Sequence, residues 1–185
     1  MVILGCRPTG RNIEQHDVFF GIAPSLVDLI PDMVDFWPEA NGKIHIDSWR
    51  KVENVDGFKI DILPLSDIPI KSVKSNRLFF INLGGYKVND MEEYHYKMLT
   101  VADNKSQAIQ TAKKTAFYKH CGYSGAVSHI DDKYGIDVDD FYTIEDILHP
   151  KYKEKFHIHI SKNQHRKEDE LHIGYLTLSK LRQGL

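Results

Sequence analysis

The chain has 185 residues, enough for one large domain or for two small domains that share a core. Its content of 42% hydrophobic and 27% charged residues is typical of a folded globular protein and argues against a disordered chain. The formal net charge of −2 argues against a strongly basic nucleic-acid binder.

The N-terminal part of the chain predicts two strands and a helix. Ser25 is the expected N-cap of the helix, with Asp28 at the capping-box position. Because Pro31 lacks an amide donor, it should kink this helix, and Pro38 should mark its end. The predicted elements in chain order are an apolar strand at 2–4, a largely buried strand at 16–22 and a helix from Leu26.

Two more strands complete this first half. Residues 43–49 alternate apolar and polar side chains with a period of two, which indicates a strand. Asp56-Gly57 predicts a tight hairpin turn that leads into a strand at 58–62. A connector with two prolines follows at 64–77.

The second half predicts the same order of elements. Asn104 and Gln107 are the expected cap of its helix, Gly122 its end, and Asp139-Asp140 the final turn. The predicted strands lie at 77–83, 93–101 and 127–131. A row of small side chains should let the helix approach its sheet closely, namely Ala108, Ala112 and Ala116.

The C-terminal segment, 149–185, predicts a further hairpin. Residues 156–160 and 171–175 alternate apolar and polar side chains on either side of a polar run. This segment holds eight Lys or Arg and four acidic residues, a net charge of +4, which leaves −6 for residues 1–148. A basic segment of this kind more often packs against an acidic body than binds a polyanion.

Matching residues recur in order in the two halves, which predicts an internal duplication. Leu4-Gly5 returns as Leu83-Gly84, Glu14-x-His16 as Glu93-x-His95, and His45-Ile46-Asp47 as His129-Ile130-Asp131. The predicted fold class is α+β, with two tandem ββαββ-like repeats whose antiparallel sheets are related by a pseudo-twofold axis, plus a C-terminal β-hairpin. The predicted divisions are a first repeat at 1–63, a connector at 64–77, a second repeat at 78–148 and a C-terminal extension at 149–185.

The repeated polar residues form the candidate site. Within each Glu-x-His or His-x-Asp pair, the two side chains lie two positions apart on a strand, so both point to one face of the sheet. Such a set could bind a divalent metal or orient a histidine as a general base. The alternative is that these groups brace strand ends by satisfying backbone groups or each other, and we expect this structural role. The set consists of Glu14, His16, His45, Asp47, Glu93, His95, His129 and Asp131.

Four C-terminal histidines form a second candidate site for Zn²⁺ or Ni²⁺, because the predicted hairpin could bring their imidazoles together. The alternative is a solvated polar face of an amphipathic hairpin, and we expect this role. They are His157, His159, His165 and His172.

Three stretches together resemble a known family: the Leu-Gly-Cys start that runs to Glu14-Gln15-His16-Asp17, the stretch 81–86, and the stretch 128–135. The family is a mainly proteobacterial one catalogued as domain of unknown function number 1543. The resemblance covers nearly the whole chain and implies a bacterial source and a duplicated α+β fold. It implies no reaction, cofactor or catalytic residue.

The expected function is a non-enzymatic binding or interaction module, with a cleft at the seam of the repeats for a small molecule, a peptide or a protein. The sequence shows no nucleophile–base set or cofactor fingerprint, so catalytic residues are unknown and no cofactor is expected. One alternative is a metal-assisted hydrolase that uses the Glu-x-His and His-x-Asp pairs around a divalent metal. The other is a weak nucleic-acid binder that uses the basic C-terminal segment.

The cellular setting is predicted from two simple features. The two cysteines, Cys6 and Cys121, show no metal-type spacing, which fits a reducing cytoplasm. No apolar stretch approaches the roughly 20 residues needed to cross a bilayer. We therefore expect a cytoplasmic protein that makes no membrane contact.

Overall fold

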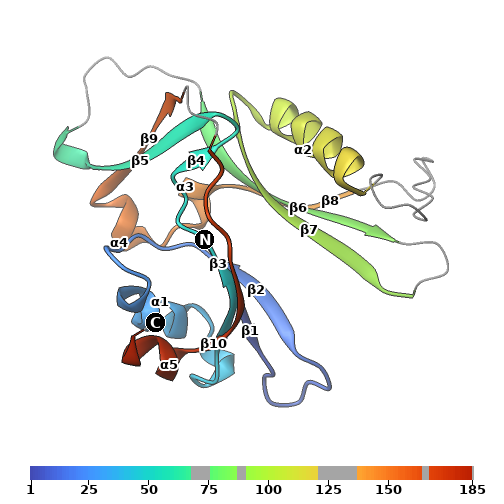
Figure 1. Ribbon diagram of the computed structural model, residues 1–185, viewed down its shortest axis with the longest axis vertical. Helices are drawn as coiled ribbons and strands as arrows, with labels where there is room; N and C mark the ends of the chain where they lie inside the picture. Colours follow the sequence, from blue (N-terminus) through green and yellow to red (C-terminus); the bar gives the residue numbers. More distant parts are fainter. Residues whose placement is uncertain (68–75, 87–90, 121–136, 164–166, 185) are drawn as a thin grey trace. The chain divides into compact units, whose positions relative to one another are not determined.

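The computed structural model describes residues 1–67, 76–86, 91–120, 137–163 and 167–184, with the backbone alone at 86, 115–120 and 137 (Figure 1). These residues form two compact units, each of which is discontinuous in sequence. Unit 1 comprises Met1–Asn54, Leu148–Phe156 and Lys167–Leu185, and unit 2 comprises Val55–Ile147 and His157–Arg166. The sequence had suggested contiguous segments instead.

Unit 1 contains a four-stranded antiparallel sheet with strand order β10-β3-β1-β2. Its strands are β1 (Val2–Cys6), β2 (Gln15–Phe19), β3 (His45–Trp49) and β10 (His172–Thr177). The central strand β1 is buried because its apolar side chains meet the core, where Leu4 and Ile46 are fully buried with Met33. The two edge strands, β2 and β10, carry more exposed side chains.

Unit 1 also contains short helices, and the predicted kink at Pro31 is wrong. The helices are η1 (Val27–Leu29), α1 (Ile30–Phe36), η2 (Pro38–Ala40), α4 (Pro150–Lys153) and α5 (Leu178–Gln183). Pro31 lies in the first turn of α1, where no amide donor is needed, because the turn before it is a 3-10 helix. The predicted N-cap at Ser25 is also wrong, because Leu26 is the residue that precedes the 3-10 turn and it makes no side-chain cap; the Ser25 amide and hydroxyl instead donate hydrogen bonds to the Asp28 carboxylate.

Unit 2 contains two three-stranded sheets. The first has the order β4-β5-β9, from β4 (Asn54–Val55), β5 (Phe58–Pro64) and β9 (Phe156–Lys162). The second has the order β7-β6-β8, from β6 (Arg77–Tyr86), β7 (Glu93–Ala102) and β8 (Asp137–Thr143). The short helices η3 (Leu65–Asp67) and α3 (Ile144–Ile147) follow β5 and β8 in the chain.

The predicted hairpin turn at Asp56-Gly57 is confirmed. Both residues have positive φ angles, 53° for Asp56 and 78° for Gly57, as a two-residue type I′ turn between β4 and β5 requires. The Asp56 carboxylate also accepts hydrogen bonds from the Thr100 hydroxyl at 2.6 Å and from the Val101 amide at 3.0 Å. The turn thereby holds β7 beside the β4–β5 hairpin within unit 2.

The long helix α2 (Lys105–His120) lies along one face of the β7-β6-β8 sheet (Figure 1). Its predicted capping box is confirmed, because Asn104 accepts a hydrogen bond from the Gln107 amide and Gln107 accepts one from the Asp103 amide, each at 3.0 Å. Its small side chains, Ala108 and Ala112, are fully buried against the sheet. The side chain of Ala116 and the predicted helix end at Gly122 lie outside the described residues.

The fold class α+β is confirmed, but the predicted C-terminal hairpin is wrong. Strand β9 pairs with β5 in unit 2, whereas β10 pairs with β3 in unit 1. The alternation of side chains identified both strands but carried no information about their partners, which are distant in sequence. The basic segment 149–185 is therefore divided between the units and is not an appended tail.

A second correction concerns the end of the second half of the chain. The predicted turn at Asp139-Asp140 is wrong, because strand β8 runs through both residues. The predicted strand at 127–131 lies outside the described residues. Among the helices that the structure describes, none combines the length and the hydropathy needed to span a bilayer.

Candidate metal centre

The candidate site of unit 1 lies over Gly5 in the central strand β1. In the strand register, Gly5 is paired with His16 of β2 on one side and with His45 of β3 on the other. Adjacent strands are about 4.8 Å apart, so side chains from β2 and β3 can meet above a residue that has no side chain. A Cβ atom on Gly5 would come within 3.0 Å of His45 Nε2 and of Asp47 Oδ2. The glycine therefore makes room for the cluster.

A β-bulge brings Asp47 into this space. Strand β3 pairs with β1 through Ser48 opposite Ile3 and Ile46 opposite Leu4, so Asp47 is the extra residue between them. A bulge of this kind redirects a side chain, and bulges are common beside functional sites. The result is that His45 and Asp47 both reach the space above Gly5.

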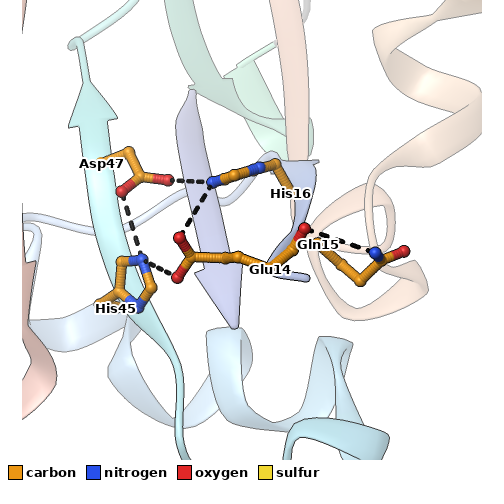
Figure 2. Close-up of polar contacts among 5 residues, drawn as sticks. All are labelled: Glu14, Gln15, His16, His45 and Asp47. Atoms are coloured by element: carbon orange, nitrogen blue, oxygen red, sulfur yellow. Dashed lines mark hydrogen bonds and ion pairs between the residues drawn. The ribbon is translucent and has the colours of Figure 1, made fainter. Parts of the chain in front are cut away.

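Four side chains converge there in an alternating ring, which Figure 2 shows. His16 Nε2 lies 3.3 Å from Asp47 Oδ2 and 3.7 Å from Glu14 Oε2. His45 Nε2 lies 3.0 Å from Glu14 Oε1 and 3.3 Å from Asp47 Oδ1. Each imidazole nitrogen thus faces both carboxylates. We refer to Glu14, His16, His45 and Asp47 as the unit 1 cluster.

The buried side of the unit 1 cluster has unsatisfied polar atoms. The side chain of His45 is 8% exposed, whereas those of Glu14 and His16 are each 46% exposed. Among the described residues, no group forms an aligned hydrogen bond with His45 Nε2 or with Asp47 Oδ2, although both atoms are buried. Oxygens of Glu14 and Asp47 lie 3.0 Å and 3.3 Å from His45 Nε2, but neither has the geometry of a hydrogen bond with it. Buried polar atoms of this kind usually have a partner.

Two neighbours restrict the chemistry of the unit 1 cluster. The ring of Tyr175, on β10, packs on the His45 imidazole with a centroid distance of 4.4 Å and so limits how far that ring can turn. Burial raises the pKa of the Cys6 thiol, and the nearby carboxylates of Glu14 and Glu39 raise it further. Cys6 therefore stays protonated at neutral pH in the metal-free protein.

Unit 2 repeats this arrangement around Gly84. In the register of β6, Gly84 is paired with His95 of β7 and with Asp137 of β8, as Gly5 is paired with His16 and His45. Strand β8 also has a bulge. Its Asp140 is paired with Asn82 of β6, and its Val138 is paired with Leu83, the residue before Gly84. Asp139 is the extra residue and occupies the place that Asp47 has in unit 1.

Three side chains converge over Gly84, namely Glu93, His95 and Asp139, which we call the unit 2 cluster. His95 Nε2 lies 3.2 Å from Asp139 Oδ2 and 4.0 Å from Glu93 Oε2. The ligand atoms of the three residues all lie within 4.8 Å of one another. A Cβ atom on Gly84 would come within 2.8 Å of oxygens of Asp139 and Glu93, so a side chain at this position would displace both carboxylates from their present places.

The structure brings together part of the predicted set and adds one residue to it. Glu93 and His95 lie together as predicted, while His129 and Asp131 lie outside the described residues. Sequence comparison missed Asp139, because it matched Asp47 with Asp131 instead. Val138-Asp139 also resembles Ile46-Asp47, and that alternative alignment was the available signal. Common ancestry of the two halves stays a prediction.

The predicted metal site at the C-terminal histidines depended on a C-terminal hairpin, which does not form. His157 and His159 lie on β9, in the β4-β5-β9 sheet. His172 lies on β10 and stacks on Trp49 with a centroid distance of 3.9 Å and an interplanar angle of 7°. His165 lies outside the described residues. The zinc or nickel site at these four residues stays a prediction.

Comparison with known proteins supports the family resemblance. Residues 11–62, which contain the unit 1 cluster, match the model of a family described as Domain of Unknown Function (DUF1543). The predicted resemblance to this family is confirmed over these residues. No curated protein matches the sequence significantly.

One solved structure shows the same fold over nearly the whole chain. The crystal structure of a protein Il1583 from Idiomarina loihiensis is similar to this chain with a TM-score of 0.63 and 23% sequence identity. The similarity covers 96% of this chain and 94% of that chain. At this identity the similarity concerns the fold alone, so the chemistry has to be argued from the side chains.

Proposed function

We propose that the protein binds a divalent transition-metal ion, with Zn²⁺ as the preferred ion, at the unit 1 cluster. The observation that carries the proposal is the pair of buried atoms, His45 Nε2 and Asp47 Oδ2, that lack an aligned hydrogen bond and face the same space as Glu14 and His16. A bound cation supplies the partner that both atoms need.

The distances between the ligand atoms support tetrahedral coordination. Zn²⁺ binds imidazole nitrogen and carboxylate oxygen at roughly 2.0–2.2 Å, so neighbouring ligand atoms of a tetrahedral site are roughly 3.3–3.5 Å apart. The nitrogen–oxygen distances within the unit 1 cluster range from 3.0 to 3.7 Å. A ligand set of this size needs only small side-chain shifts to close around the ion.

The charges also support a divalent cation. With neutral imidazoles, the unit 1 cluster carries two negative charges from Glu14 and Asp47. One divalent ion balances them, and imidazole together with carboxylate is a usual ligand set for zinc. The competing explanation is a brace in which protonated histidines pair with the carboxylates. That brace leaves His45 Nε2 without an aligned acceptor, whereas a metal ion takes up its lone pair.

The number of ligands favours a binding role over hydrolysis. A catalytic zinc usually has three protein ligands and one water, whereas a fully coordinated ion has four protein ligands. The unit 1 cluster offers four. The proposal therefore keeps the expected non-enzymatic binding role and makes a metal ion the ligand, and metal-assisted hydrolysis requires one carboxylate to give way to water.

The test is the metal content of untagged, full-length protein measured by elemental analysis after removal of loosely bound ions. His45→Ala and His16→Ala should each lower bound zinc by about one ion per chain and reduce the affinity at least about 100-fold, since even second-layer partners of metal ligands are worth about 10–100-fold. Substitution with Co²⁺ should give the intense visible absorption of tetrahedral coordination in the wild type and not in these variants.

His157→Ala is the matched control, because it removes an imidazole from β9 and should leave zinc binding by the unit 1 cluster unchanged. A folded wild-type protein that takes up no zinc would refute the proposal in favour of the brace. Loss of zinc in His157→Ala alone would instead support a site at the C-terminal histidines.

A further inference from the structure

The unit 2 cluster differs from the unit 1 cluster in the side chains that it brings together. We infer that Glu93, His95 and Asp139 bind a second divalent ion, and that this site discriminates less between Zn²⁺ and Mn²⁺ than the unit 1 cluster does. The inference rests on the proposed function, because unit 1 supplies the template for the geometry. Its own basis is the arrangement of ligands around Gly84.

Two backbone features of the unit 1 site recur in unit 2. A glycine in the central strand lies between a histidine of one neighbouring strand and the bulged segment of the other. The bulge then aims a carboxylate over the glycine, where a Cβ atom would meet Asp139 and Glu93 oxygens within 2.8 Å. A strand can form without a bulge and without glycine, and both features weaken it. Their joint recurrence indicates that the space above Gly84 is used as the space above Gly5 is.

The three side chains of the unit 2 cluster are close enough together to bind one ion. Their ligand atoms all lie within 4.8 Å of one another, and His95 Nε2 is 3.2 Å from Asp139 Oδ2. Adjacent ligands of an octahedral ion at about 2.1–2.2 Å are roughly 3.0 Å apart, so one ion can contact all three groups after small rotations. The side chains are 29–38% exposed, which leaves the ion within reach of water.

The types of ligand in the unit 2 cluster indicate which ions it prefers. The strand position that holds His45 in unit 1 holds Asp137 in unit 2, because the two are paired with Gly5 and Gly84 respectively. Among the described side chains, the unit 2 cluster has one imidazole and two carboxylates, whereas the unit 1 cluster has two of each. Imidazole favours zinc and its neighbours, whereas carboxylate and water suit Mn²⁺ and Mg²⁺. Zinc still binds each set more tightly than manganese does, so the difference appears in the ratio of the two affinities.

The experiment measures Zn²⁺ and Mn²⁺ binding to full-length protein, with free Mn²⁺ followed by its electron paramagnetic resonance signal. Asp139→Asn and Glu93→Gln should each lower the Mn²⁺ affinity of one site at least about 10-fold. Asp140→Asn is the matched control, because the neighbouring Asp140 carboxylate accepts a hydrogen bond from Asn82 at 3.1 Å and lies outside the cluster. His45→Ala should remove one zinc and leave Mn²⁺ binding by the unit 2 cluster unchanged.

The outcomes separate this inference from the proposed function. Zinc loss in His45→Ala, with no effect of Asp139→Asn or Glu93→Gln on either ion, overturns the second site and keeps the first. Loss of metal in the two unit 2 variants, with none in His45→Ala, keeps the second site and overturns the first. Equal Zn²⁺ to Mn²⁺ affinity ratios at the two sites overturn the difference in selectivity.

Discussion

Gly5→Ala is the smallest change that tests the unit 1 site, because it adds one methyl group beneath the metal ligands. The new Cβ atom would lie within 3.0 Å of His45 Nε2, whereas ordinary contacts begin at 3.4 Å. His45 Nε2 therefore has to move by more than about 0.4 Å. Metal–ligand distances tolerate about 0.2 Å, so the shift should lower zinc affinity at least about 100-fold.

The same substitution has a predictable effect on stability. Replacing glycine with alanine reduces the entropy of the unfolded chain and by itself stabilises a protein by about 0.4–1 kcal/mol. Overpacking a buried region costs about 1–3 kcal/mol, and the His45 ring is confined by Tyr175. The net expectation is a loss of about 1–2 kcal/mol in the free energy of unfolding, or a fall of roughly 2–8 °C in Tm for a chain of this length.

The assay combines zinc titration with urea and thermal unfolding in the absence of metal. Gly85→Ala is the matched control, since Gly85 lies on the same kind of strand and a Cβ atom there meets nothing within 4 Å. It should be neutral or slightly stabilising. Adding His45→Ala to Gly5→Ala should recover most of the stability lost through the clash, because the double variant removes the atom that the new methyl group meets. Wild-type Tm and wild-type zinc affinity in Gly5→Ala would refute the reasoning.

Three further predictions concern acidic residues that connect distant segments of the chain within one unit. Burial alone would raise the pKa of Asp32, but hydrogen bonds from two side chains of α4 outweigh burial and lower that pKa. Asp32→Asn should therefore lower the free energy of unfolding by about 1–3 kcal/mol at pH 7. The difference from wild type should shrink as the pH falls below about 4, which urea titrations at several pH values would reveal. Asp169→Ala removes the acceptor of two backbone amides at 53–54 and should expose these amides to faster hydrogen exchange, with no change at β7. Asp56→Ala places alanine at positive φ and leaves Thr100 without its acceptor, so unfolding should require about 1–3 kcal/mol less, whereas an unchanged urea midpoint would contradict the role of this turn.

Local features of the chain were predictable because their causes are local. The Asp56-Gly57 turn, the Asn104–Gln107 cap and the close-packed face of α2 all follow from neighbouring residues, and the structure contains each of them. The predicted kink at Pro31 was wrong. The effect of a proline depends on its position in the helix, and a preceding 3-10 turn places the start of α1 at Ile30, so Pro31 lies in the first turn.

The sequence by itself determined the α+β class, the short-range elements and the side chains that share a strand face, such as Glu14 and His16. Only the tertiary structure decided that β9 and β10 join different sheets and that Asp139 takes the place of Asp47. Strand partners and bulges depend on backbone hydrogen bonds between distant segments, which the period of the side chains does not record. The role of Gly5 and Gly84 could be recognised only when the strands on either side of them were known. The side chains that fill the space above each glycine come from those strands.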